Sequence, residues 1–402
     1  MGKFDNVPSR EEVLRRYFKI WTPMAETESI PVDEALGRVV ASQKTTLYDL
    51  PVYRASAADG IAVKGDDFKD KMPDTSNFKL GVDFVRADTG DDFSDDYDTI
   101  IAIEDVVSME DGLKLKDDVE VIPGQKVKGK GSHVHKGEIY LTKGNRLRPT
   151  DLAALVMGGH KDVAVIKKPK VAYIPTGSEL IPEGCTPKRG ENLNSNSILV
   201  ENFLIEMGAE PIIMPIVRDN KRDLKEALYK ASSKADIVLI SGGSSKGEED
   251  FNTKLIEKEG SIFQHYVACV PGFPLGIGFF ENKPIVNLAG PPIACYNGLD
   301  WCVRALIDRW YHRKSLSNLE VLAIADDDIR VQKECSLLVK LNLYYDEDNK
   351  LHAVPLSHHK DSLVSCLTTE GQIRTIMGGE QIKKGDTFKI ELLVHPNEIP
   401  RK

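Results

Sequence analysis

The segment I-S-G-G-S-S-K-G-E-E-D, residues 240–250, indicates the fold class of this chain. It continues the apolar run Ile237–Ile240 and contains three glycines, one lysine and three acids. A short apolar run that ends in glycines is typical of a buried parallel strand, and open parallel sheets bind ligands beyond the carboxyl ends of their strands. Glycines expose backbone N–H groups, and a helix N-terminus adds partial positive charge. We therefore predict that Gly242, Gly243 and Gly247 hold an anion such as phosphate.

The acids of this segment have two interpretations. Asp250 stands where a helix N-cap belongs, so capping alone would explain it. Acids beside a phosphate pocket also hold Mg²⁺, which would make Asp250 a metal ligand. The segment is not a Walker A loop, because no GK[ST] follows at the required spacing.

The surrounding pattern predicts a doubly wound α/β domain over residues 169–314. Alternating strands and helices favour a parallel sheet that is covered on both faces. The expected strands are 171–175, 211–217, 236–241, 264–269 and 284–288, and the expected helices are 196–207, 222–232, 251–259 and 293–311.

The remaining residues predict three further parts. Residues 1–45 and 136–168 form a discontinuous helical domain, in which helices at 9–21 and 150–158 pack together. Residues 46–135 are rich in glycine, aspartate and short β-like runs, and they form an inserted β-rich domain. Residues 315–402 form a C-terminal β domain.

Composition excludes several classes of protein. The chain has 402 residues, 41% hydrophobic and 29% charged, which is typical of a soluble globular protein of two to four domains. Its net charge of -9 argues against a general nucleic-acid binder. The six cysteines form no CxxC pair, and no apolar run approaches membrane-spanning length. We expect a cytoplasmic protein with reduced thiols that binds neither nucleic acid nor membrane.

Two other strand ends carry the same kind of signal. P-T-G-S-E-L follows one predicted strand at 175–180, and N-L-A-G-P-P ends another at 287–292. In the inserted domain, Asp59 precedes a glycine. Taken alone, Asp59, Thr89 and Glu104 are ordinary turn or loop residues.

Taken in order, the motifs resemble the molybdopterin molybdotransferase family, which includes the MoeA proteins and the E domain of gephyrin. The similarity runs from about residue 10 to residue 395. The motifs are A-L-G-R-V-V-A at 35–41, S-A-A-D-G-I-A-V at 56–63, P-T-G-S-E-L at 175–180, S-N-S at 195–197 and S-G-G-S-S-K-G-E-E-D-F at 241–251.

This resemblance implies an activity and an assembly. Molybdate would be inserted into adenylylated molybdopterin with release of AMP, assisted by Mg²⁺. The protein would be an elongated homodimer, with its active site between the α/β domain of one subunit and the inserted domain of the other. A molybdopterin adenylyltransferase and apo-molybdoenzymes would be its partners.

The resemblance also assigns site residues. Carboxylates repel anionic substrates unless a divalent ion intervenes, so the acids make most sense as direct or water-mediated metal ligands. The catalytic residues are Asp59, Glu104, Glu179 and Asp250, of which Asp59, Glu179 and Asp250 are metal ligands. The ligand-binding residues are Thr89, Thr176, Gly177, Asp219, Ser241, Gly242, Gly243, Ser244, Ser245, Lys246, Gly247, Pro271, Gly272, Gly290 and Pro292.

The chain departs from the family pattern at this site. V-P-G-F-P at 270–274 stands where the family has K-P-G-K-P, so Val270 and Phe273 replace two lysines. L-A-G-P-P at 288–292 replaces L-P-G-N-P. Lys246 either compensates for the lost lysines or faces solvent. A working molybdotransferase with a reshaped pocket, a carrier or chaperone for the pterin or cofactor, and an enzyme for another oxyanion such as tungstate or a modified pterin all remain open.

Overall fold

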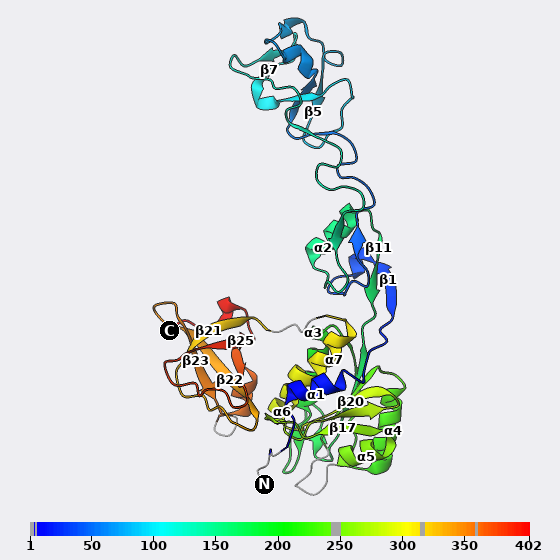
Figure 1. The fold of residues 1–402 in the computed structure, drawn as a ribbon, viewed down its shortest axis with the longest axis vertical. Helices are drawn as coiled ribbons and strands as arrows, with labels where there is room; N and C mark the ends of the chain where they lie inside the picture. The colour runs from blue at the N-terminus through cyan, green and yellow to red at the C-terminus, as the bar shows by residue number, and fades with distance from the viewer. Residues whose placement is uncertain (1–3, 5, 243–250, 314–317, 358–360) are drawn as a thin grey trace. The chain divides into compact units, whose positions relative to one another are not determined.

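The computed structural model describes residue 4 and residues 6–242, 251–313, 318–357 and 361–402. The chain divides into two compact units (Figure 1). One consists of Met1–Glu26 with Lys167–Lys402, and the other is Thr27–Ile166. No helix among the described residues is long and apolar enough to cross a membrane.

The first unit is built on a six-stranded sheet. Its order is β15 (Glu210–Ile213), β12 (Lys170–Pro175), β16 (Ile237–Ser241), β20 (Lys283–Leu288), β19 (Gly276–Phe280) and β17 (Ser261–His265). The first four strands are parallel, as expected, whereas β19 and β17 add an antiparallel edge that the sequence pattern did not predict. In β19, Gly278 is required because a Cβ there would lie 2.0 Å from the Ser261 carbonyl oxygen.

Helices cover both faces of this sheet. Alternate residues of β12, Ala172 and Ile174, point to a core that includes Leu224 and Leu228. Figure 1 shows helices on both sides of the sheet. The first side has α4 (Lys221–Ser232) and α5 (Phe251–Glu259); the second has α1 (Arg10–Tyr17), α3 (Ser195–Glu206), α6 (Pro292–Gly298) and α7 (Arg304–Trp310).

The N-terminal helix α1 belongs to this unit. Ser9 caps it by accepting a hydrogen bond from the Glu12 N–H, 3.2 Å away. Tyr17 is buried, donates to the Gly278 carbonyl oxygen at 3.0 Å and stacks on Phe279. The structure therefore corrects the expectation that this helix packs against the helix at 150–158, because its apolar face is used by β19. The four-domain boundaries otherwise remain a prediction.

The second unit contains the helix α2 and several small sheets. β1 pairs with β11, and a core that includes Val32, Leu155 and Val163 lies beside α2. The residues 46–135 contain a three-stranded sheet of order β5-β4-β6. The bounds are β1 (Thr27–Pro31), β2 (Lys44–Thr45), β3 (Ala55–Ser56), β4 (Gly60–Val63), β5 (Phe84–Ala87), β6 (Thr99–Ala102), β7 (Val106–Ser108), β8 (Lys114–Leu115), β9 (Val127–Lys128), β10 (Ile139–Leu141), α2 (Pro149–Met157) and β11 (Asp162–Ile166).

The C-terminal residues form a closed barrel. The pairings run β22–β23–β21–β25–β24 and return from β24 to β22, so no edge remains in this ring. The bounds are β21 (Glu320–Ala325), β22 (Ser336–Tyr345), β23 (Leu351–Leu356), α8 (Leu363–Leu367), β24 (Gly371–Arg374) and β25 (Thr387–Leu392). A short strand of the α/β domain, β18 (Cys269–Val270), pairs with β22 from outside the ring.

The barrel holds one histidine between two carboxylates. The Nδ1 of His352 lies 2.7 Å from Asp326 Oδ1, and its Nε2 lies 3.2 Å from Asp346 Oδ2. The hydrogen bond to Asp326 is the main cause that raises the pKa of His352 above its ordinary value; partial burial opposes it, and the bond to Asp346 adds to it.

We predict that the thermal stability of the barrel falls as the pH rises through the folded-state pKa of His352. The unfolded pKa is about 6.5, so the stabilisation is complete below that pH and is lost above the raised folded value. NMR titration of the ring and thermal unfolding at several pH values measure this. His352→Gln should remove the dependence, while His133→Gln, at an exposed position outside the barrel, should keep it. A ring that titrates at or below about 6.5 would contradict the prediction.

Candidate functional site

Three glycine-containing strand ends meet at the carboxyl edge of the parallel strands. The N–H of Thr176, after β12, donates to the carbonyl oxygen of Ser241, the last residue of β16, at 3.0 Å, and its hydroxyl donates to the same oxygen at 2.7 Å. Beyond β20, the nearest neighbour of a Cβ built on Gly290 would be the Cα of Gly242, at 4.0 Å. The sequence analysis predicted that these residues lie at one edge of the sheet, and in the structure they are close together.

Two of these positions require glycine. Gly242 has a φ of +101°, and a Cβ there would lie 2.1 Å from the Thr176 carbonyl oxygen. Gly177 has a φ of +150°, and a Cβ there would lie 2.8 Å from the carboxylate oxygens of Glu179. A side chain at residue 242 would push the loops apart, and at residue 177 the positive φ itself favours glycine; glycine at both positions leaves the backbone open to close approach of a ligand.

A buried asparagine fastens these loops, and the sequence analysis missed it. The Nδ2 of Asn252 donates to the Gly242 carbonyl oxygen at 2.9 Å and to the Thr176 hydroxyl at 3.3 Å. It also lies 3.4 Å from the Oδ1 of Asn287, whose Nδ2 lies 3.2 Å from the Thr253 hydroxyl. The segment F-N-T-K-L-I-E-K-E at 251–259 is largely polar, so the sequence carried no signal that Asn252 is buried.

Asn196 supplies an unpaired acceptor at the same edge. This residue lies in the first turn of α3, and its Nδ2 donates to the Gly290 carbonyl oxygen at 2.7 Å. Its Oδ1 is buried and has no hydrogen-bond partner within the described part of the chain. Because a buried acceptor without a partner is costly, this oxygen is suited to accept a ligand N–H or O–H.

Two carboxylates flank Ser178, directly after β12. The Ser178 N–H donates to Asp219 Oδ2 at 3.1 Å, and the Asp219 N–H donates to the Ser178 hydroxyl at 3.2 Å. Glu179 and Asp219 are both exposed. Because both carboxylates are exposed and lie beside a glycine turn, they are accessible to a cation.

A second group of predicted residues gathers in the unit Thr27–Ile166. The Thr89 N–H donates to Asp59 Oδ1 at 2.7 Å, and this bond holds the pKa of Asp59 below its ordinary value. The Ile103 N–H donates to the Asp59 carbonyl oxygen at 2.7 Å, which places Glu104 in the adjoining 3₁₀ turn. Asp59, Thr89 and Glu104 therefore lie in one place and are exposed.

The loop with the altered lysine positions lies at the start of α6, which begins at Pro292. The Asn297 side chain donates to the Pro271 carbonyl oxygen at 2.6 Å, and a Cβ on Gly272 would lie 3.3 Å from the Ala294 carbonyl oxygen.

Phe273 takes part in an aromatic stack. Its ring lies 5.0 Å from that of Tyr266, which in turn stacks on His265 at 3.9 Å. Phe4 meets Phe273 edge-on at 5.0 Å. Where the family has a charged side chain, this chain has an aromatic cluster.

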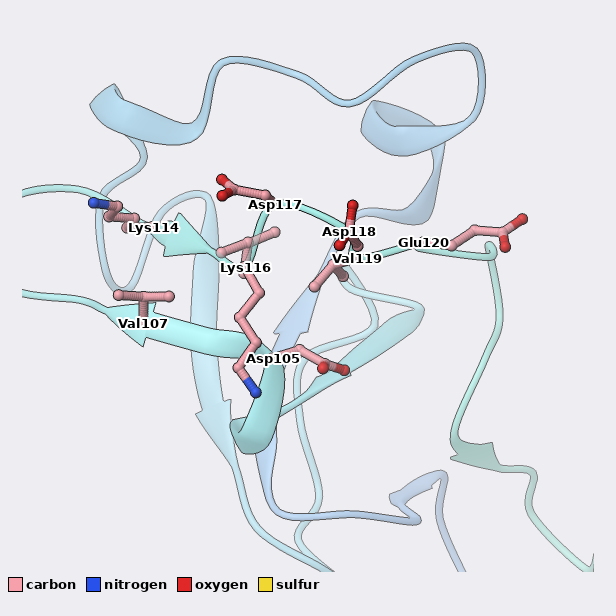
Figure 2. Close-up of a pocket in the computed structure, with 9 residues that line it drawn as sticks. Asp105, Val107, Lys114, Lys116, Asp117, Asp118, Val119 and Glu120 are labelled. Atoms are coloured by element: carbon pink, nitrogen blue, oxygen red, sulfur yellow. The ribbon is translucent and has the colours of Figure 1, made fainter.

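A cavity of about 700 Å³ lies in the inserted region. Figure 2 shows that Asp117, Asp118 and Glu120 come from the segment after β8, whereas Asp105 comes from the 3₁₀ turn that also contains Glu104. Asp59, Thr89 and Glu104 do not line it, so this cavity is separate from the predicted site residues.

Several predicted residues lie outside the described residues. They are Gly243, Ser244, Ser245, Lys246, Gly247 and Asp250. Within the described ranges, no three His, Cys, Asp or Glu side chains gather as a metal site. The metal set Asp59, Glu179 and Asp250 therefore stays a prediction.

We predict that Asn252→Ala lowers the free energy of unfolding of the α/β domain by about 1–3 kcal/mol, because it leaves buried polar groups of Thr176 and Gly242 without a donor. Urea denaturation followed by the buried tryptophans measures this. Asn202→Ala, at an exposed position on α3, should change it by less than about 0.5 kcal/mol. Equal effects of the two substitutions would contradict the fastening role.

Comparison with known proteins gives the same assignment along most of the chain. Residues 8–159 match the model "MoeA N-terminal region (domain I and II)", and residues 172–309 match "Probable molybdopterin binding domain". A protein of Bacillus subtilis named molybdopterin molybdenumtransferase is 27% identical over 96% of this chain and 94% of its own length. A Haemophilus influenzae protein of the same name is 29% identical over 72% of this chain and 74% of its own.

A solved structure agrees in fold. The molybdopterin biosynthesis MoeA protein of Pyrococcus horikoshii is 27% identical, and the match covers 97% of this chain and all of that one with a TM-score of 0.81. The multidomain α/β architecture with a closed barrel is thus the architecture of those proteins. The chain belongs to the MoeA family.

Proposed function

We propose that this protein acts in molybdenum cofactor biosynthesis, where it inserts molybdenum from molybdate into adenylylated molybdopterin and releases AMP. One observation carries the proposal: the glycine-containing ends of β12, β16 and β20 meet within the segment that matches the molybdopterin-binding domain. The relatives named molybdopterin molybdenumtransferase support the same reaction.

The meeting strand ends suit an anionic ligand with a flat polar ring. Backbone N–H groups from Gly242 to Gly247 would bind phosphate, and the serines at 241, 244 and 245 would add donors. The unpaired Oδ1 of Asn196 would accept a hydrogen bond from the ligand. Lys246 would place one positive charge in the same segment.

The acids fit a divalent cation chemically, because Mg²⁺ prefers hard oxygen ligands. Asp59, Glu179 and Asp250 would hold it, with Glu104 near Asp59 and Asp219 near Glu179. Bound Mg²⁺ supplies charge neutralisation at the phosphoanhydride as AMP leaves. The Thr89 N–H keeps Asp59 ionised, as a metal ligand must be.

We propose a homodimer whose active site is shared between subunits. Asp59, Thr89 and Glu104 belong to one compact unit, and Glu179 and Asp219 belong to the other. A second copy allows the inserted domain of one chain to complete the α/β site of the other. A molybdopterin adenylyltransferase would supply the substrate and apo-molybdoenzymes would accept the product, in the cytoplasm.

One observation favours a second candidate. Phe273 lies within an aromatic stack and Val270 is apolar, so neither can bind an anion as the lysines of the family would. Loss of two charge-assisted contacts weakens anion binding by on the order of a hundredfold. The alternative is therefore a carrier or chaperone for molybdopterin or the finished cofactor, or an enzyme for another oxyanion or a modified pterin.

We predict molybdate-dependent release of AMP when the purified protein is titrated with adenylylated molybdopterin, Mg²⁺ and then molybdate. Asp59→Asn and Glu179→Gln should each lower the rate by about a hundredfold or more, because each removes a charge that holds the cation. Asp95→Asn, at an exposed acid of the inserted domain, is the control. Binding of the pterin nucleotide without release of AMP would contradict the proposed enzyme activity and would support the carrier function.

A mixing experiment tests the shared site. When Asp59→Asn and Glu179→Gln subunits are unfolded and refolded together, random pairing should restore about a quarter of the wild-type rate. Half of the dimers would then contain one site with both acids intact. A mixture that is no more active than either variant alone would show that both acids act within one chain.

A further inference from the structure

Positive charge is in excess where the α/β domain contacts the barrel. Asp300, 6% exposed, accepts from Arg304 Nη2 at 2.7 Å and from Arg374 Nη2 at 2.6 Å. One buried carboxylate thus accepts hydrogen bonds from two guanidinium groups, one in each domain.

Two more cations lie near this group: Lys340 is close to Asp300, and Arg10 is close to Arg374. Lys340 is 5% exposed, and burial lowers its pKa to about 8. Burial also lowers the pKa of Arg10, and the neighbouring charge of Arg374 lowers it further. Arg10 pairs with Glu11 at 2.8 Å, but that carboxylate is mostly exposed, so solvent screens the pair. Among the side chains of this group that are not exposed, four are cations (Arg10, Arg304, Lys340 and Arg374) and two are carboxylates (Asp300 and Glu391).

A cavity of about 490 Å³ opens beside two of these cations. Arg10 and Arg374 line it, together with the apolar side chains of Val331, Ile376 and Phe388. It therefore combines guanidinium groups with an apolar wall.

Both arginines have an unused donor. The Nε atoms of Arg10 and Arg374 are buried and have no hydrogen-bond partner among the described residues. The Arg374 side chain is only 10% exposed, and its Nη2 is already engaged by Asn297 and Asp300. A buried N–H without an acceptor is rare in folded proteins and points to a missing partner.

The cavity also has acidic lining residues. Glu320 and Glu380 are both exposed, and Glu320 pairs with Lys389 at 3.8 Å. Glu391 accepts from the Gln372 side chain at 2.9 Å. Solvent screens the exposed Glu320 and Glu380, and Glu391 already accepts a hydrogen bond. The two Nε–H groups, in contrast, are buried and have no partner among the described residues.

We propose that this cavity binds a small organic carboxylate with an apolar body. Its two oxygens, which accept up to four hydrogen bonds, would bind the guanidinium groups of Arg10 and Arg374. Its hydrocarbon part would lie against Val331, Ile376 and Phe388. The proposal does not depend on the molybdopterin site.

Calorimetric titration of the full chain with phenylacetate tests this site. Phenylacetate should bind at least about tenfold more tightly than acetate, which lacks the apolar body, or phenylacetamide, which lacks the charge. Arg10→Gln should weaken phenylacetate binding by about tenfold or more. Arg15→Gln, at an exposed position of the same helix outside the cavity, should leave it unchanged.

A second variant keeps the test decisive if Arg10→Gln fails to fold. Ile376→Glu changes a lining side chain that is 78% exposed; it removes an apolar contact and adds a charge that solvent partly screens, so it should weaken phenylacetate binding by about threefold or more. Val364→Glu, at a position 69% exposed and outside the cavity, is its control. Absence of phenylacetate binding, equal binding of phenylacetamide, or unchanged binding in Ile376→Glu would overturn the proposal.

Discussion

The close approach of the Thr176 carbonyl to Gly242 is the contact on which the functional edge of the sheet depends. No side chain fits at residue 242, because its Cβ would lie 2.1 Å from that oxygen. The two loops can therefore lie in direct contact, and the buried Asn252 side chain donates hydrogen bonds to both of them. Asn287 extends the same network to β20, so one steric constraint fixes the ends of three strands.

Sequence reasoning predicted this edge well because it rests on local rules. Apolar runs followed by glycines identified β12, β16 and β20, and the resemblance placed the corresponding loops together. The sequence analysis failed where the structure depends on contacts between segments that are far apart in the sequence. β19 carries two glycines and lacks a clear strand pattern, and its pairing with β17 depends on close backbone contact at Gly278. The position of α1 was equally hidden, since an amphipathic face does not say which surface it will cover.

The candidate site was predictable in its residue types but less so in its supporting contacts. The Asp59–Thr89 hydrogen bond and the hydrogen bonds between Ser178 and Asp219 involve residues of motifs that the sequence showed. Asn252 and Asn196 were not assigned, because a single asparagine in a sequence carries no signal of burial. At residues 270–274 the departures have a physical meaning: Phe273 exchanges a solvated charge for ring contacts with Tyr266 and Phe4.

The pairing of β18 with β22 links the α/β domain to the barrel. Cys269 and Val270 of the α/β domain pair with β22 of the barrel, and they directly precede the Pro271–Gly272 turn beside α6. The turn is thus held by the barrel at one end and by Asn297 of the α/β domain at the other. The position of this turn therefore depends on the barrel as well as on the α/β domain, although the barrel does not itself contain the turn.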